Sequence, residues 1–286
     1  MTIPVLPVGD GPHRLSLGVR PLGDAPICVI DPDRHAAEVA LRRRLLDADR
    51  DARFAALPVT HDAQRAALAL LVADVARQGA LPILLGEDDA VPLDGPDPLD
   101  WAGRHLAEDL LLLDAGAEDV PLVAGSLCFP NGWSLRPALG RSIAEIHAPV
   151  PGFAEAIGAA TLALMRRLRP GRPVWRANWT LRTTDALDMS PGVVLPPAPA
   201  RPEDAAGVMV RVERQTLSRL PATTAVLFTI HTRSRPLGEV AADPDRARRL
   251  LDTLASMPTA MRDYKGIADL VVPVSRYLRG RLTDPS

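Results

Sequence analysis

The runs PVWRANWTLR at residues 173–182, VMVRVERQTL at 208–217 and TAVLFTIHT at 224–232 decide the fold. The first two alternate apolar and polar side chains, which is the period of a β-strand, and the third has strand composition. A proline-rich loop at 191–202 separates the first two, and no helical pattern lies between any of them. Strands that follow one another without helices favour antiparallel pairing. The sequence therefore predicts an α+β fold with an antiparallel sheet.

Helical patterns precede and follow these strands. We expect a single domain, with an N-terminal arm and helices at 1–110, the sheet and a pocket core at 111–240, and C-terminal helices at 241–286. Helix-start residues and apolar spacing mark the individual elements. The expected helices are His35–Asp47, Asp62–Gln78, Leu99–Asp109, Ser134–Ile146, Phe153–Leu168, Asp245–Ser256 and Val274–Arg281, and the expected additional strands are Ile27–Ile30, Leu110–Asp114 and Val120–Phe129.

The composition argues against several classes of function. A formal net charge of −2 gives no electrostatic basis for binding nucleic acid or an anionic membrane surface. The two cysteines predict neither a disulfide framework nor a zinc site, which favours a reducing cytoplasm. The first fifteen residues do not predict a secretory signal, and no apolar run reaches the ~20 residues of a membrane span. Lys265 is the only lysine, a bias that we attribute to codon usage.

The segment SLCFPNGWSLRPALGRSIAEIHAPVPGF at 126–153 contains the most informative histidine. The helix expected at Ser134–Ile146 ends at His147, because Pro149 and Pro151 forbid its continuation. His147 is then either a helix cap or a metal ligand. No second ligand lies three or four residues away, so a chelated mononuclear metal is not favoured. A single histidine beside an apolar aromatic pocket is what haem requires.

The other histidines carry weaker signals. We expect His13, His35, His61 and His105 to be exposed on polar segments or helix faces. His231 lies inside the third strand run, where a histidine with one hydrogen-bond partner is the simple interpretation. It is the second choice for a metal ligand after His147.

Aromatic side chains gather in the middle of the chain. Three of the four tryptophans lie there, and flat rings in one region form either a ligand pocket or an ordinary core. The rings in this region are those of Phe129, Trp133, Phe153, Trp175, Trp179 and Phe228.

Strand periodicity gathers a second set of polar residues. Arg211, Glu213 and Gln215 fall on one face of the second strand run, where they are either exposed to solvent or line a polar pocket. A carboxylate there can accept a proton or hold an ammonium group, and a guanidinium can bind a carboxylate. Arg176 and Asn178 fall on the face of the first run opposite the two tryptophans, and either pair could line a pocket.

Four blocks resemble a known family. FPNGW at 129–133, IHAPVPGF at 146–153, VWRANWTL at 174–181 and VERQTLSRLPATTAVLFTI at 212–230 occur in this order. They resemble the haem-dependent oxidative N-demethylase family over nearly the whole chain, and the N-terminal third matches loosely. Long ungapped blocks of this kind are more specific than a short motif.

The resemblance implies a haem-binding PAS-like domain, with helices flanking the sheet and helical additions at both ends. It implies haem b, O2 and the monooxygenase-like N-demethylation of a small secondary amine such as dimethylamine. Electrons would come from NAD(P)H through a separate flavin and iron–sulfur reductase. The family's histidine in the HAPVP block corresponds to His147, which the resemblance therefore implies as the iron ligand.

The remaining site residues follow from the blocks and from strand parity. The rings expected to bind the cofactor with His147 are those of Phe129, Trp133, Trp175, Trp179 and Phe228. The residues expected to act on the oxygen side are Arg211, Glu213 and Gln215.

Two other functions remain open from the sequence. A haem-based gas or redox sensor would use the same fold, although the chain shows no output motif such as coiled-coil heptads or a helix-turn-helix. A non-catalytic PAS-like binding module would use the same residues as a packed core. The sequence does not name the substrate.

Overall fold

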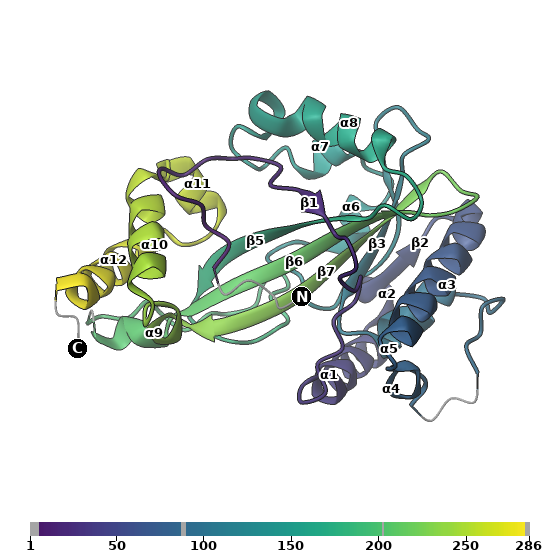
Figure 1. The fold of residues 1–286 in the computed structure, drawn as a ribbon, viewed down its shortest axis with the longest axis horizontal. Helices are drawn as coiled ribbons and strands as arrows, with labels where there is room; N and C mark the ends of the chain where they lie inside the picture. The colour runs from purple at the N-terminus through teal and green to yellow at the C-terminus, as the bar shows by residue number, and fades with distance from the viewer. Residues whose placement is uncertain (1–5, 87–89, 202, 284–286) are drawn as a thin grey trace.

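The structure is a computed structural model that describes residues 6–86, 90–201 and 203–283. Within these residues one sheet of seven strands has the order β1-β5-β6-β7-β3-β4-β2, and all neighbours are antiparallel (Figure 1). The predicted α+β class and antiparallel sheet are confirmed. The strands are β1 (Arg20–Pro21), β2 (Phe54–Ala56), β3 (Asp109–Asp114), β4 (Leu122–Ser126), β5 (Val174–Arg182), β6 (Met209–Arg219) and β7 (Ala225–Pro236).

The three long strands predicted from the sequence lie side by side as β5, β6 and β7. β6 is buried over its whole length except at its two ends. Polar side chains on this strand therefore need partners inside the protein, because burying an unpaired polar group costs about 1–3 kcal/mol. Beyond its short pairing with β1, strand β5 is an edge of the sheet.

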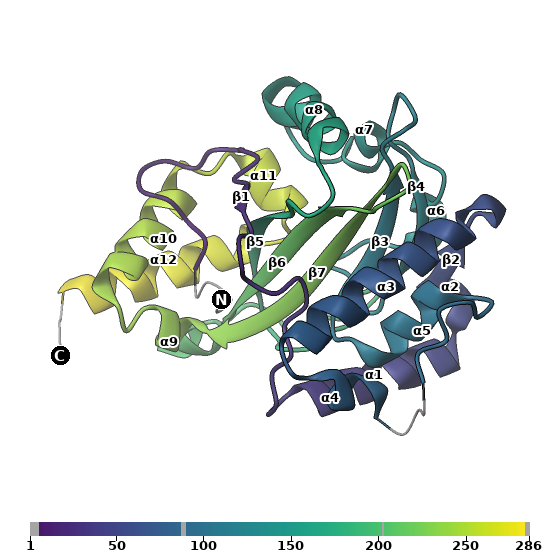
Figure 2. The same cartoon turned by 45° about the vertical axis from the view of Figure 1, so that its right-hand side comes forward.

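N-terminal helices cover one face of the sheet (Figure 2). Leu110 and Leu112 of β3 and Ala124 of β4 point into this layer, since alternate strand residues face the same side. The helical elements of this part of the chain are α1 (His35–Ala48), α2 (Arg50–Arg53), a 3₁₀ turn (Pro58–Thr60), α3 (His61–Arg77), α4 (Leu81–Leu85) and α5 (Pro98–His105).

Helices from the middle of the chain cover the opposite face. Leu111 and Leu113 of β3 pack there with Leu217 of β6, in a second apolar cluster. These elements are α6 (Leu135–Ala138), α7 (Ile143–Ile146), a π-helix (Ala154–Gly158) and α8 (Ala159–Arg167).

The C-terminal helices form a third cluster on the far ends of β5 and β6, around Leu181, Val210 and Val212. None of the helices in the described residues is long and apolar enough to cross a bilayer. The elements of this part are a 3₁₀ turn (Glu203–Gly207), α9 (Leu237–Val240), α10 (Pro244–Ser256), α11 (Thr259–Tyr264) and α12 (Ala268–Thr283).

The single helix expected at Ser134–Ile146 is wrong. The chain instead forms α6 and α7, separated by Gly140 in the left-handed region at φ +79°. Ser142 restarts the helix through a capping box, in which its hydroxyl accepts from the Glu145 amide and the Glu145 carboxylate accepts from the Ser142 amide. The helix expected at Phe153–Leu168 begins with a π turn rather than an α turn.

The strand expected at Ile27–Ile30 is also wrong. The amides of Ile27 and Cys28 donate to the Asp74 carboxylate of α3, and the Val29 amide donates to Glu108. Buried carboxylates thus take the donors that a neighbouring strand would have used.

Candidate functional site

Three adjacent strands place a grid of mainly polar side chains on the face that α6, α7 and α8 partly cover. Glu213 on β6 lies opposite Asn178 of β5 and Thr232 of β7, and residues directly opposite each other share a face. We call this grid the polar face. Its members are Arg176, Asn178 and Thr180 of β5, Arg211, Glu213 and Gln215 of β6, and Ile230, Thr232 and Ser234 of β7.

Several atoms of the polar face are shielded from solvent and unpaired. In the described part of the chain, Nε of Arg176, Nε of Arg211, Oγ1 of Thr232 and Oγ of Ser234 have no hydrogen-bond partner. Most buried polar atoms in proteins are paired, so a concentration of unpaired ones requires an explanation. These atoms make the polar face suited to a polar ligand.

His147 ends α7 beside the polar face. Its Nδ1 atom lies 2.9 Å from the carbonyl oxygen of Ile143, and a carbonyl only accepts, so Nδ1 carries the proton. Nε2 then carries the lone pair, and none of the described residues hydrogen-bonds to it. Burial lowers the pKa of His147, the Ile143 bond opposes this, and the positive charge of Arg176 lowers the pKa further. The lowered pKa favours the neutral imidazole, which has a nitrogen free to bind a metal.

Phe153 fixes the plane of this imidazole. The two rings stack with centroids 4.5 Å apart and planes 15° apart. Gly152, at φ +73°, turns the chain back so that Phe153 reaches His147. The π-helix Ala154–Gly158 starts at the next residue, and π turns occur frequently at functional sites.

Glu213 is the acid of the polar face, and two amides hold it. Its Oε2 accepts from Gln215 Nε2 at 2.9 Å and from Asn178 Nδ2 at 3.4 Å. Its Oε1 has no hydrogen-bond partner among the described residues. Glu213 thus presents one fixed oxygen that can accept a proton or a hydrogen bond from a ligand.

The two arginines of the polar face have different surroundings. The Arg211 guanidinium donates to the carbonyl oxygens of Phe129, Ala186 and Leu187, at 2.9–3.0 Å. It therefore ties two loops to β6. Arg176 donates no hydrogen bond to any described residue. Burial lowers the pKa of Arg176, and the Glu213 carboxylate partly offsets the effect.

Lys265 reaches the polar face around the edge of β5. Its Nζ donates to the carbonyl oxygen of Trp179 at 2.7 Å and to Asn178 Oδ1 at 3.4 Å. The Asn178 bond orients that amide so that its nitrogen faces Glu213. Burial lowers the pKa of Lys265 to about 8, although Glu213 opposes the shift.

The structure brings only some of the predicted rings to this face. Phe228 packs with the cluster of α6, α7 and α8. Trp175 and Trp179 point to the opposite face, into the other two clusters. Phe129 packs with the N-terminal helices, with its ring centroid 5.2 Å from the Arg42 guanidinium.

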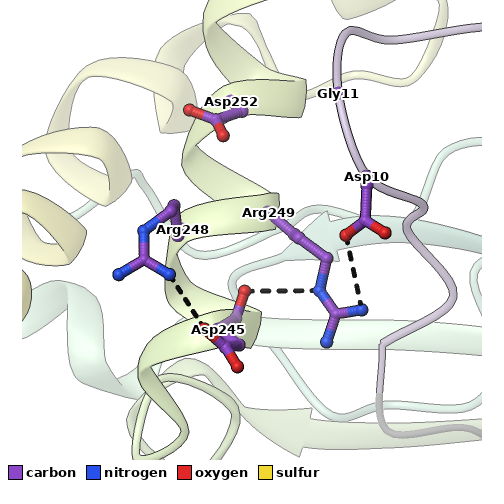
Figure 3. A pocket seen from close by; sticks show the side chains of 6 residues that line it. All are labelled: Asp10, Gly11, Asp245, Arg248, Arg249 and Asp252. Atoms are coloured by element: carbon purple, nitrogen blue, oxygen red, sulfur yellow. Dashed lines mark hydrogen bonds and ion pairs between the residues drawn. The ribbon is translucent and has the colours of Figure 1, made fainter.

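Trp133 lines a separate hollow of about 520 Å³, together with Arg53, Leu127 and Pro191. A hollow of about 320 Å³ lies between α10 and the N-terminal segment, where Arg248 and Asp245 form an exposed ion pair (Figure 3). Neither hollow includes His147 or Glu213.

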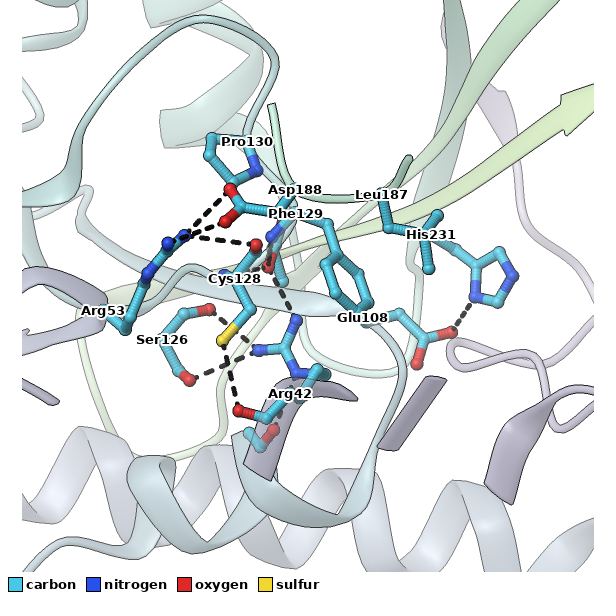
Figure 4. A network of polar contacts seen from close by, with 12 residues as sticks. Arg42, Arg53, Glu108, Ser126, Cys128, Phe129, Pro130, Leu187, Asp188 and His231 are labelled. Atoms are coloured by element: carbon cyan, nitrogen blue, oxygen red, sulfur yellow. Dashed lines mark hydrogen bonds and ion pairs between the residues drawn. The ribbon is translucent and has the colours of Figure 1, made fainter. Parts of the chain in front are cut away.

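His231 lies on the opposite face of the sheet. Its Nδ1 pairs with Glu108 Oε1 at 3.0 Å, and both side chains are buried beneath the N-terminal segment (Figure 4). Its Nε2 is buried and unpaired within the described residues. A carboxylate-paired imidazole is a pattern of metal-binding histidines, so His231 remains a rival to His147. The described residues hold no cluster of three His, Cys, Asp or Glu side chains that would suit a metal ion.

The exposed positions expected for His35 and His105 are wrong, because both side chains are buried. His105 stacks on Trp101 with ring centroids 3.9 Å apart, and its Nδ1 lies 2.7 Å from the Trp101 carbonyl oxygen. The helical periodicity of a short segment did not show which face packs inward.

Three residues of this site were not among the site residues expected from the sequence. Phe153 is the last residue of the IHAPVPGF block, and Arg176 shares strand parity with Asn178. Lys265 carried one signal in the sequence, as the only lysine of the chain.

Fold and site together define an α+β protein with a histidine-flanked polar sheet face. The model of the family described as haem-dependent oxidative N-demethylase, alpha subunit-like, matches residues 26–274. The chain belongs to this family. The family takes its name from an oxidoreductase that depends on haem.

Proposed function

We propose that the chain binds haem b through Nε2 of His147 and oxidises a small N-methylated amine with O2. The observation that carries this proposal is the imidazole of His147, whose Nδ1 donates to the Ile143 carbonyl oxygen and whose ring stacks on Phe153. A histidine that donates its second nitrogen to a carbonyl has the tautomer and orientation of a metal ligand. When bound, haem would supply the one-electron and oxygen chemistry that side chains lack.

The residues present fit such a cofactor. Haem needs one protein ligand and an apolar wall, and the cluster of α6, α7 and α8 offers Ile146, Val150 and Phe228 beside His147. The unpaired donors of Arg176 and Thr232 suit the polar groups of a cofactor or a substrate.

The side chains of the polar face would then handle the amine. Glu213 Oε1 would accept a hydrogen bond or a proton from the substrate nitrogen, while Gln215 and Asn178 fix the carboxylate. Arg211 would act by positioning, because its guanidinium bonds loop carbonyls rather than facing an open site.

The electrons would come from NAD(P)H through a separate flavin and iron–sulfur reductase. The family name designates an alpha subunit, which supports a partner protein. We further propose that the chain is a single PAS-like domain and acts in the cytoplasm.

An absorption spectrum of the protein purified from haem-supplied cells tests the proposal. We expect a Soret band that His147→Ala abolishes or shifts and that the exposed control His61→Ala leaves unchanged. A spectrum without a Soret band contradicts haem binding. A Soret band that is unchanged in His147→Ala would mean that His147 is not the ligand and that His231 is the next candidate. Amine turnover with a surrogate reductase then separates an enzyme from a sensor.

A further inference from the structure

We infer that Arg176 binds the carboxylate of the substrate, so that the substrate class is an N-methylated amino acid rather than a simple amine. The inference rests on the proposed function and deepens it. Arg176 would bind the carboxylate of a zwitterionic substrate, and Glu213 would bind its ammonium group.

The first observation is that Arg176 is unpaired. No described residue accepts a hydrogen bond from its guanidinium, and its Nε atom is shielded from solvent. A guanidinium has five donors in a fork that matches a carboxylate. A partly buried guanidinium without a hydrogen-bond partner costs free energy unless a ligand supplies the acceptor.

The second observation is the placement of Arg176 relative to Glu213. Arg176 lies directly opposite Gln215, so Glu213 is its diagonal neighbour on β6. Diagonal neighbours lie about 7–8 Å apart, and their Cβ atoms are somewhat closer. The two side chains form no ion pair with each other, and Glu213 presents its free oxygen to the same face. One small molecule with an amine and a carboxylate can reach both.

The third observation is the local excess of positive charge. Arg176, Arg182 and Lys265 all lie near Glu213, the acid of the polar face. A cationic amine alone would meet this excess unfavourably. A zwitterion brings its own negative charge, which makes its charge pattern complementary to that of the polar face.

A haem propionate has the same carboxylate chemistry, so the experiment must separate the two sources. We would titrate N-methylglycine, dimethylamine and N-methylethanolamine into the haem-loaded protein and follow the Soret band. The same three probes would be added to the haem-free protein in thermal-shift measurements. N-methylethanolamine resembles N-methylglycine in size but lacks its carboxylate.

We expect N-methylglycine to bind at least tenfold tighter than either amine, as a charge-assisted hydrogen bond permits. Arg176→Gln should abolish this preference, Arg176→Lys should keep part of it, and the exposed control Arg172→Gln should keep all of it. Equal affinities for the three probes in the wild type would overturn the inference.

A haemin titration of Arg176→Gln provides the second arm. If Arg176→Gln lowers the affinity for haem but keeps the preference for N-methylglycine, Arg176 binds a haem propionate and the substrate assignment is overturned. If the wild type binds no haem, the proposed function fails, while the thermal shifts of the haem-free protein still decide the inference.

Discussion

The Nδ1 atom of His147 lies 2.9 Å from the carbonyl oxygen of Ile143, four residues earlier on the same helix. In the neutral ring, this contact leaves Nε2 as the unprotonated nitrogen. Because His147 is the C-cap residue of α7, whose N-terminus is closed by a capping box, the imidazole is held by a capped helical turn rather than by a mobile loop. Haem ligation by His147 depends on this one orientation of the ring.

Replacing Phe153 with leucine should weaken haem binding without removing it. The ring stacks on His147, and such contacts are worth about 0.5–1.5 kcal/mol, or roughly two- to tenfold in affinity. A haemin titration followed at the Soret band measures the change. Phe54→Leu is the matched control, since the buried Phe54 packs with the N-terminal helices on the opposite face of the sheet. Equal losses in both variants would count against a specific role for Phe153.

Replacing Glu213 with glutamine should leave the Soret band in place and reduce amine oxidation about 10²–10⁴-fold, the usual contribution of a general base. The residue is held by Gln215 and Asn178, and the amide fills nearly the same space. Steady-state kinetics with a surrogate reductase measure the loss, and Glu239→Gln on an exposed position is the control. A variant with unchanged kcat/KM would exclude Glu213 from the chemistry.

Lys265 should make the stability of the protein depend on alkaline pH. Its pKa falls from 10.5 to about 8 on folding, mainly because of burial. Between these values the unfolded chain binds a proton that the folded chain has lost, so stability rises with pH. Relative to Lys265→Met, the wild type should gain up to about 3 kcal/mol between pH 7 and 10.5. Urea unfolding across this range measures the free energy of unfolding of both proteins. If the two free energies change in parallel with pH, the pKa of Lys265 is unshifted.

Replacing Gly103 with alanine should destabilise the fold by about 1–3 kcal/mol, as overpacking does in a core. A Cβ atom there would lie 2.0 Å from Oγ and 2.7 Å from Cβ of Ser126, beside the buried ion pair of Arg42 and Asp109 (Figure 4). Thermal unfolding measures the loss. Gly207→Ala, where a Cβ meets nothing within 4 Å, should be close to neutral, and an equal effect at both positions would contradict the packing argument.

The long strands could be predicted from the sequence because alternation sets which side each residue faces. That parity placed Arg211, Glu213 and Gln215 together, and the register of β5 and β6 then added Asn178 opposite Glu213. The prolines after His147 also marked the correct end of its helix.

Contacts between distant segments could not be predicted in the same way. Lys265 reaches Asn178 from 87 residues away, and a sequence pattern contains no signal for that separation. The strand expected at Ile27–Ile30 failed for the same reason, because Asp74 and Glu108 take its donors from helices and loops far along the chain.

The alternation of side chains along β5 also places its two tryptophan rings on the face of the sheet opposite the site. Trp175 and Trp179 alternate with Arg176 and Asn178, so a strand that turns its polar residues toward His147 turns its tryptophans away. The sequence marked a ring-rich region without showing which rings share a face with the histidine.

Rescue of His147→Gly by free imidazole tests the central claim most directly. The variant keeps the backbone bond from residue 147 to Ile143 but lacks the ligand, and added imidazole can occupy the space of the lost side chain. We predict that haemin with this variant gives a Soret band unlike that of the wild type, and that imidazole restores the wild-type spectrum. A variant whose spectrum already equals that of the wild type without imidazole would contradict ligation by His147.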